Sequence, residues 1–133
     1  MEIFRTDKLD ILKYIAPNIT TTPDEPVLVT IDNIAKNMIE HPDYTCISVA
    51  FDGADLIGYA VAWVVRDHIW IDQAWTSVDY SREEVGKKIL EVIKVWALEN
   101  DIHDIRFETT RSTKALTRAW GFEEFSSIMK MEI

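Results

Sequence analysis

The segment YSREEVGKK, Tyr80–Lys88, lies between a strand-like aromatic run, His68–Ser77, and a periodic helical pattern, Glu83–Glu99. A strand that enters a helix through a short loop presents free backbone N–H groups at the positive end of the helix dipole, where phosphate binds readily. Close approach of a ligand to such a loop favours glycine, and the segment contains one, Gly86. Two adjacent glutamates in the same segment oppose an anion. The segment therefore predicts a strand–loop–helix unit and a candidate phosphate site with unfavourable charge.

Strand patterns extend upstream from this unit. The run Tyr44–Phe51, the turn DGAD at 52–55 and the run Leu56–Val65 form a strong hairpin pattern, because the hydrophobic period changes to two on both sides of a glycine-containing turn. A second tight turn, Arg66-Asp67, leads into His68–Ser77. Short connections of this kind join antiparallel strands. Three consecutive antiparallel strands are therefore predicted.

Two helices are predicted before these strands. Asp7–Ala16 has apolar residues at helical spacing and ends at a proline, and Pro17–Pro26 is predicted to be a surface connection. Val27–Glu40 starts with β-branched residues, but the spacing of its apolar residues favours a helix with Asp24 as a cap. Met1–Thr6 fits either an edge strand or a lead into the first helix.

The apolar residues of Glu83–Glu99 fall on one helical face. The pattern then predicts a strand over Asp104–Arg111, a short helix around Ser112–Trp120 closed by Gly121, and a final strand over Phe122–Ile133. A chain of 133 residues is large enough to bury a core without metals or disulfides. A single domain, 1–133, is the expectation.

The chain has 14 basic and 23 acidic residues and a net charge of −9. Such a charge disfavours non-specific binding to nucleic acids or anionic membranes, which requires a positive field, and it favours a basic ligand. No apolar run approaches the length of a membrane span and the N-terminal residues lack a signal-peptide pattern, so a cytoplasmic location is predicted. The single cysteine, Cys46, is predicted to be a small buried hydrophobe, and the spacing of the histidines predicts no metal site.

Several phrases, taken in order, resemble the GNAT superfamily of acyl-CoA-dependent N-acyltransferases. Its first hairpin is similar to three phrases here: EHPDY at 40–44, FDG at 51–53 and LIGYA at 56–60. Its pyrophosphate loop and following helix are similar to DYSREEVGKKIL at 79–90. Its closing Gly-Phe is similar to AWGFE at 119–123. The resemblance covers 27–133. It implies an α+β fold with α/β/α layers: a twisted mixed β-sheet with helices on both faces, splayed between His68–Ser77 and Asp104–Arg111.

The same resemblance implies acetyl-CoA or CoA as a co-substrate. Its pantetheine arm would lie in the splay, against the backbone of Ala74, Trp75 and Thr76. Its pyrophosphate would lie on the backbone of the loop and of the first helical turn, at Ser81, Glu84, Val85, Gly86 and Lys87.

The chain departs from the family pattern at four positions. Ser81 stands where the family loop has Gln or Arg, and Glu84 stands where it has glycine. Thr117 occupies the place of a tyrosine that protonates the departing thiolate. Trp70 occupies the commonest place of the glutamate that serves as general base. A different side chain would therefore have to act as the base.

Asp72 is the candidate general base, because a carboxylate near a cleft can have a raised pKa that suits it to accept a proton from an amine. His68 is its candidate neighbour. Strand alternation predicts one face with His68, Trp70, Asp72 and Ala74 and an opposite face with Ile69, Ile71, Gln73 and Trp75. The alternative is that Asp72 is a hydrogen-bonded strand residue and His68 a turn residue.

Two functions remain open. The first is an acyl-CoA (acetyl-CoA)-dependent N-acyltransferase that acts on an amine of a small molecule or peptide, and the acidic surface would suit a cationic acceptor such as a polyamine, a lysine side chain or an aminoglycoside. The second is a catalytically inactive binding or structural module of the same fold, which the four departures favour. Trp63, Trp70 and Trp75 either line a cleft or fill the sheet–helix interface, with core filling favoured. A homodimer through the last strands is a further expectation.

Overall fold

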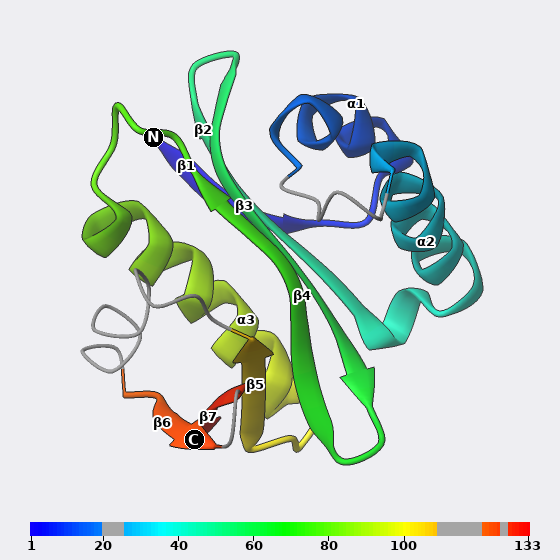
Figure 1. The fold of residues 1–133 in the computed structure, drawn as a ribbon, viewed down its shortest axis with the longest axis vertical. Helices are drawn as coiled ribbons and strands as arrows, with labels where there is room; N and C mark the ends of the chain where they lie inside the picture. Colours follow the sequence, from blue (N-terminus) through cyan, green and yellow to red (C-terminus); the bar gives the residue numbers. More distant parts are fainter. Residues whose placement is uncertain (20–25, 109–120, 126–127) are drawn as a thin grey trace.

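In the computed structural model, which describes residues 1–19, 26–108, 121–125 and 128–133, one seven-stranded sheet has the order β1-β2-β3-β4-β5-β7-β6 (Figure 1). β4 and β5 run parallel, and the other neighbouring strands run antiparallel. The sheet is therefore mixed, as predicted. The strands are β1 (Glu2–Thr6), β2 (Thr45–Asp52), β3 (Asp55–Val65), β4 (His68–Thr76), β5 (Asp104–Glu108), β6 (Glu123–Phe125) and β7 (Ile128–Glu132).

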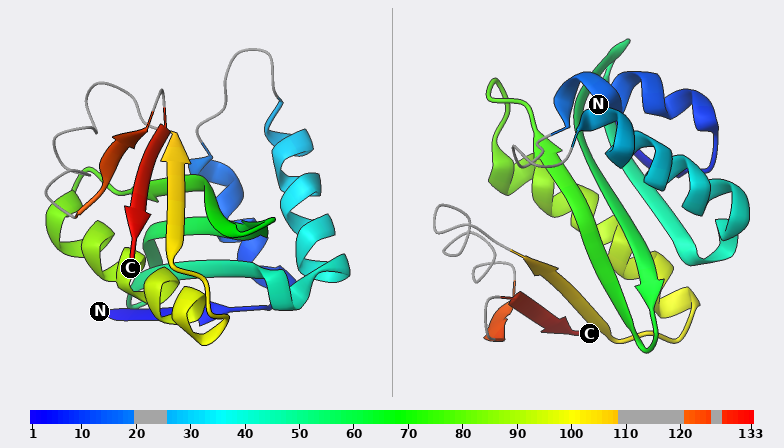
Figure 2. Two further views of the ribbon diagram at one scale, coloured as in Figure 1. Left: turned by 90° about the horizontal axis from the view of Figure 1, so that it is seen from below. Right: turned by 45° about the vertical axis from the view of Figure 1, so that its right-hand side comes forward.

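Helices cover both faces of the sheet. α1 (Leu12–Ile15), with a 3-10 turn on either side, and α2 (Val27–Glu40) lie on one face, and α3 (Lys87–Glu99) lies on the other (Figure 1 and Figure 2). This arrangement confirms the predicted α+β class with helices on both faces. Among the described residues, no helix has the length and apolar character needed to cross a membrane.

Each face of the sheet has its own apolar core, and strand alternation divides β2 between them. Cys46 belongs to the core under α3, whereas Ile47 and Val49 belong to the core under α1 and α2. Ser48 also points toward α3, where its buried hydroxyl donates a hydrogen bond to the carbonyl of Ile89 at 3.0 Å. β2 is therefore covered on both faces and joined directly to α3.

The start of α3 lies in close contact with β3 at Gly58. A Cβ atom at this position would lie 2.7 Å from Cδ1 of Ile89, 3.2 Å from Cγ1 of Val85 and 3.2 Å from the carbonyl oxygen of Trp75. Real Cβ atoms essentially never approach another heavy atom as closely as the first of these distances. Glycine at position 58 therefore allows the first turn of α3 to approach the sheet.

The edges of the sheet are β1, at the start of the chain, and β6, with β7 between β6 and β5. Met1–Thr6, left open between strand and helix lead-in, contains β1, which pairs antiparallel with β2. The prediction of one final strand over Phe122–Ile133 is wrong, because the segment contains two strands, β6 and β7, antiparallel to each other. Serines at 126 and 127, outside the described residues, separate the two strands in the sequence, and serine is a turn residue. The sequences of β6 and β7 are both typical of strands, so the hydrophobic pattern did not reveal the change of chain direction between them.

The remaining sequence predictions divide into two groups. The helix expected from Glu83 begins with a π turn, Arg82–Gly86, from which α3 continues to Glu99. The cap at Asp24, the short helix around Ser112–Trp120 and the position of Thr117 lie outside the described residues.

β4 and β5 separate after a short contact. Among the described residues, their parallel pairing joins Ile69–Ile71 to Ile105–Phe107, whereas β4 continues to Thr76 beside β3. Figure 2 shows the two strands diverging from their common end. The edge of a strand without a neighbour presents backbone N–H and C=O groups that a ligand can use. The open edge over 72–76 therefore lies where the splay was predicted.

Candidate active site

A β-bulge places Asp72 out of register in the centre of β4. Val61 of β3 is opposite Gln73, and the next residue, Ala62, is opposite Ile71, so Asp72 is the extra residue that the β3–β4 register skips. A bulge bends the strand, increases its twist and changes the direction of a side chain, and bulges are frequent beside active sites. Asp72 also lies where the contact with β5 ends. The predicted base therefore stands at the start of the open edge.

The bulge also exchanges the faces of β4, and the alternation predicted from the sequence is wrong for this reason. Ile69 and Ile71, before the bulge, lie in the core under α3. Trp75, after the bulge, packs against the core under α1 and α2, with its ring centroid 6.1 Å from that of Tyr59. An extra residue shifts the period of two by one position. Ile69, Ile71 and Trp75 therefore do not share a face.

Asp72 lines a pocket of about 180 Å³ between α2 and the strands β3 and β4, formed by Thr30, Asn33, Lys36, Asn37, Trp63 and Asp72. A second pocket of about 390 Å³ shares two of these residues and is lined by Asn37, His41, Tyr44, Trp63, Val64 and Arg66. The two pockets share Asn37 and Trp63 and so are neighbours along α2. We call them together the α2 groove.

The tryptophans have different roles. Trp96 is buried at 3% exposure in the core under α3, as predicted. Trp63 is only half-buried, because it packs against the core under α1 and α2 and also lines both pockets of the α2 groove. Trp70 is opposite Trp63 on the neighbouring strand and is also half-buried. Core filling was therefore an incomplete prediction for Trp63, which is also a cleft residue.

Tyr59 is a candidate site residue that the sequence reasoning missed. Its side chain is 1% exposed, and its hydroxyl has no hydrogen-bond partner in the part of the chain that the structure describes. Burial raises the pKa of Tyr59, and the charge of Asp72 raises that pKa further, so the hydroxyl stays protonated at neutral pH. A buried polar group without a partner is rare and can mark a ligand or water site. The only signal in the sequence was a tyrosine inside the apolar phrase LIGYA at 56–60.

Phenylalanine at position 59 is expected to increase the free energy of unfolding by about 1 kcal/mol, because an unpaired buried hydroxyl costs roughly 1–3 kcal/mol. Equilibrium unfolding in urea measures the change. The control is Tyr80→Phe, which removes a hydroxyl that donates to Asp52, and no gain is expected there. A loss of stability in Tyr59→Phe would show that the Tyr59 hydroxyl does have a partner, such as an ordered water.

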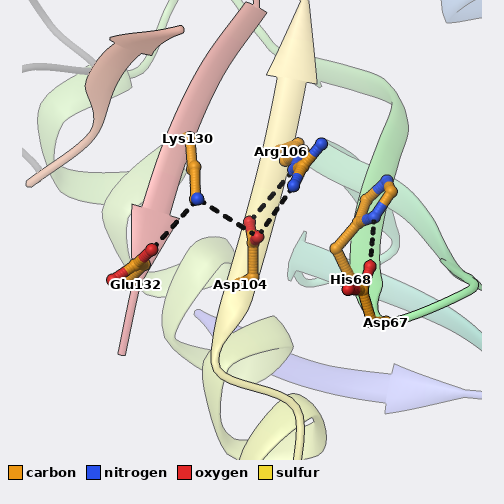
Figure 3. A network of polar contacts seen from close by, with 6 residues as sticks. All are labelled: Asp67, His68, Asp104, Arg106, Lys130 and Glu132. Carbon is orange, nitrogen blue, oxygen red and sulfur yellow. Dashed lines mark hydrogen bonds and ion pairs between the residues drawn. The ribbon is translucent and has the colours of Figure 1, made fainter.

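His68 is not placed beside Asp72. Its Nδ1 lies 3.2 Å from Oδ1 of Asp67, the preceding residue, and it stands four positions before Asp72 along β4, roughly 13 Å at about 3.3 Å per residue. Figure 3 shows this pair next to a separate network centred on Asp104, which accepts hydrogen bonds from Arg106 at 3.1 and 3.3 Å. Lys130 joins Asp104 to Glu132 in the same network, with N–O distances of 3.6 and 3.0 Å. His68 is therefore the first residue of β4, beside the turn and away from Asp72, and not the turn residue of the alternative interpretation.

The candidate phosphate loop is wound into the start of α3. The Oγ atom of Ser81 accepts a hydrogen bond from the backbone N–H of Glu84 at 3.3 Å, and the Ser81 carbonyl accepts one from the N–H of Val85 at 2.9 Å. Gly86 has ordinary helical angles, with φ −61°, so no left-handed backbone requires a glycine there. Oε1 of Glu84 lies 3.8 Å from Nζ of Lys88 in an exposed ion pair, which offsets part of the negative charge of Glu84.

The other candidate cofactor residues lie on both sides of this loop. Ala74 is exposed and Thr76 is half-buried on the open part of β4, and Lys87 is exposed at the first position of α3. Val85 is 1% exposed in the core, so only its backbone could contact a ligand. The hydroxyl of Tyr80 donates to the carboxylate of Asp52, which ties the segment before the loop to the β2–β3 turn.

Two other chemistries find little support in the residues. Cys46 is fully buried, and burial raises the pKa of its thiol to about 12, so it is not a thiolate nucleophile at neutral pH. Among the described residues, no three His, Cys, Asp or Glu side chains gather where they could hold a metal ion.

Comparisons with known proteins agree with the fold. A family model described as "Acetyltransferase (GNAT) family" matches residues 11–122, and a search of curated protein sequences returned no match. Similar structures include the PaiA N-acetyltransferase from Thermoplasma acidophilum in complex with coenzyme A, with 15% identity, a TM-score of 0.73 and coverage of 100% of both chains. An IAA acetyltransferase from Bacillus cereus has 19% identity, a TM-score of 0.75 and coverage of 99% of both chains. An aminoglycoside N-acetyltransferase from Acinetobacter haemolyticus has 13% identity and a TM-score of 0.75, and covers 95% of this chain and 93% of its own.

Proposed function

Since the chain belongs to the GNAT acetyltransferase family, we propose that it transfers the acetyl group of acetyl-CoA to an amine bound in the α2 groove, with Asp72 as the general base. The observation that carries the proposal is the bulge in β4. It places the Asp72 carboxylate in the groove at the point where the open edge of β4 begins. A base and a site for the acyl donor therefore meet at one position, which is the arrangement that acyl transfer to an amine requires.

The residues of the chain fit acetyl-CoA. The open backbone over 72–76 would hold the pantetheine arm, and the backbone at Ser81 and the first turn of α3 would hold the pyrophosphate. The N-terminal end of α3 favours an anion, and Lys87 and Lys88 add positive charge at the same end. Glu84 opposes the anion, but its ion pair with Lys88 reduces the repulsion. Bound acetyl-CoA supplies the acetyl group, whose bond to sulfur breaks as its bond to the amine nitrogen forms.

Asp72 takes the proton that the amine loses. It lies at the wall of the smaller pocket, opposite the α2 side chains, so an amine in this pocket lies close to the carboxylate. Tyr59, kept protonated by burial and by the charge of Asp72, adds no second negative charge. In our proposal the released thiolate takes its proton from solvent, because threonine at position 117 is a poor acid.

The alternative of an inactive module receives no support from the matched structures, which include acetyltransferases with bound coenzyme A. The test is calorimetric titration of the protein with CoA and acetyl-CoA, followed by an assay of free thiol release with a panel of amines. Binding in the micromolar range with amine-dependent thiol release is expected. No heat of binding at millimolar CoA would overturn the proposal, and binding without thiol release would favour the inactive module.

Glutamine at position 84 is expected to tighten CoA binding by roughly fivefold, because removing one negative charge several ångströms from a pyrophosphate is worth about 1 kcal/mol at high effective dielectric. The dissociation constant from calorimetry measures it. Glu91→Gln is the matched control, since Glu91 is an exposed glutamate on α3 beyond its first turn. Unchanged affinity in Glu84→Gln would show that the pyrophosphate does not bind at this loop.

We also propose a location, a set of excluded partners and an oligomeric state for the protein. A cytoplasmic location and the absence of nucleic-acid or membrane partners follow from the net charge of −9 and the lack of long apolar segments. A homodimer through the last strands would be measured by light scattering on a sizing column.

A further inference from the structure

The α2 groove has a charge pattern that differs from the rest of the chain. The chain carries a net charge of −9, yet among the described residues that line the two pockets only Asp72 is a carboxylate. The same lining contains two permanent cations, Lys36 on α2 and Arg66 in the β3–β4 turn. The groove is therefore locally basic within an acidic protein, and its negative charge lies at one end, at Asp72.

The charges of the two cations are not paired with any carboxylate in the part of the chain that the structure describes. Within the described ranges of the chain, neither Lys36 nor Arg66 takes part in an ion pair. The carboxylate nearest to Arg66 in the chain, Asp67, contacts His68 instead. Two unpaired cations that share a groove offer charge-assisted hydrogen bonds to an anion, and a guanidinium can bind a carboxylate with two of its N–H groups.

The positions of the charges define the shape of a ligand. Asp72 and Lys36 line the same pocket of about 180 Å³, and Arg66 lines the adjoining pocket of about 390 Å³. Pockets for drug-sized ligands measure roughly 300–1,000 Å³, so the first pocket suits a group the size of an amino acid. Trp63 lines both pockets and presents an aromatic wall along the path from Asp72 to Arg66.

On the basis of the proposed function, we propose that the acceptor is an amino acid or a short peptide with a free carboxylate. Its amine lies at Asp72, and its carboxylate lies at Lys36 or, for a longer acceptor, at Arg66. This class differs from the purely cationic acceptors that the net charge alone suggested, because a polyamine would place positive charge against Lys36 and Arg66. The substrate class is thus determined by the charge of the groove and not by that of the whole chain.

Binding without turnover tests this inference separately from catalysis. With saturating CoA present, calorimetry compares the twenty standard amino acids and a set of glycyl dipeptides with their C-terminal carboxamides, which differ only in the carboxylate. At least one free acid is expected to bind about tenfold or more tightly than its amide, as charge-assisted hydrogen bonds suggest. Equal or tighter binding of every amide would overturn the inference even if CoA binds and amines are acetylated.

Charge variants locate the carboxylate. In Lys36→Gln, the preference for the free acid over the amide is expected to fall about tenfold for amino acids. In Arg66→Gln, the same fall is expected for dipeptides. Lys8→Gln is the matched control, because Lys8 is an exposed lysine that lines neither pocket. A preference that persists in both groove variants would overturn the assignment. If CoA does not bind to the protein without substitutions, the proposed function itself is contradicted.

Discussion

Asparagine in place of Asp72 is expected to lower kcat for acetyl transfer by about 10²–10⁴-fold, the usual contribution of a positioned general base. The carboxamide has the same size as the carboxylate but cannot accept the proton of the attacking amine. Because the change lies on the groove side of β4 and not in the loop before α3, the dissociation constant for CoA is expected to change little. Steady-state kinetics and calorimetry on the same protein measure both quantities.

Two companion variants make the Asp72 result specific. Asp72→Glu keeps a carboxylate and is expected to retain more activity than Asp72→Asn. Asp32→Asn makes the same chemical change at an exposed position of α2 that lines neither pocket, and full activity is expected there. Near-normal kcat in Asp72→Asn would show that another group or a water is the base.

Valine at position 58 is expected to destabilise the fold by about 3 kcal/mol or more, at the upper end of what overpacking costs in a filled core. The new Cβ would meet Ile89 at 2.7 Å and the backbone oxygen of Trp75 at 3.2 Å, and a backbone atom cannot rotate away. Because Val85 and Ile89 belong to the start of α3, the same change is expected to displace the candidate phosphate loop and to weaken CoA binding. Urea unfolding and calorimetry measure the two effects.

A double-mutant cycle identifies the contact responsible. Ile89→Val removes Cδ1, the atom that a Cβ at position 58 would meet first. The combination Gly58→Ala with Ile89→Val is therefore expected to lose less stability than the sum of the two single changes, since contacting residues are not additive. Strict additivity would show that the closeness of α3 to β3 does not depend on this contact.

Much of the fold could be predicted from local pattern. The hairpin around Gly53 and the turn at Arg66 follow from period and turn residues, and both positions have positive φ, 61° and 58°. The helix Val27–Glu40 has the predicted bounds, because the spacing of its apolar residues outweighs the β-branched start. The mixed sheet with helices on both faces was predicted from the resemblance to the family, which rests on the order and spacing of the elements.

The candidate site was harder to predict. Asp72 was named from its residue type and strand, but its direction depends on a bulge that no residue in the sequence marks. Tyr59 was missed because a tyrosine in an apolar strand has no distinctive spacing. His68 was a candidate neighbour of Asp72 because alternation puts both on one face, yet it lies at the far end of the same strand and contacts Asp67. Alternation describes faces, and it does not describe distance along a strand.

The sequence by itself determined the order of the helices and strands from Val27 to Glu99, the strand–loop–helix unit at Tyr80–Lys88 and the family, because each depends on residues close together in the chain. Only the tertiary structure decided which residues meet at the candidate site. The register of β3 against β4 skips Asp72, the short contact between β4 and β5 opens an edge, and the packing of α2 places Lys36 in the same pocket as Asp72. These relations join residues that are distant in the chain, and strand register and helix packing depend on the whole core.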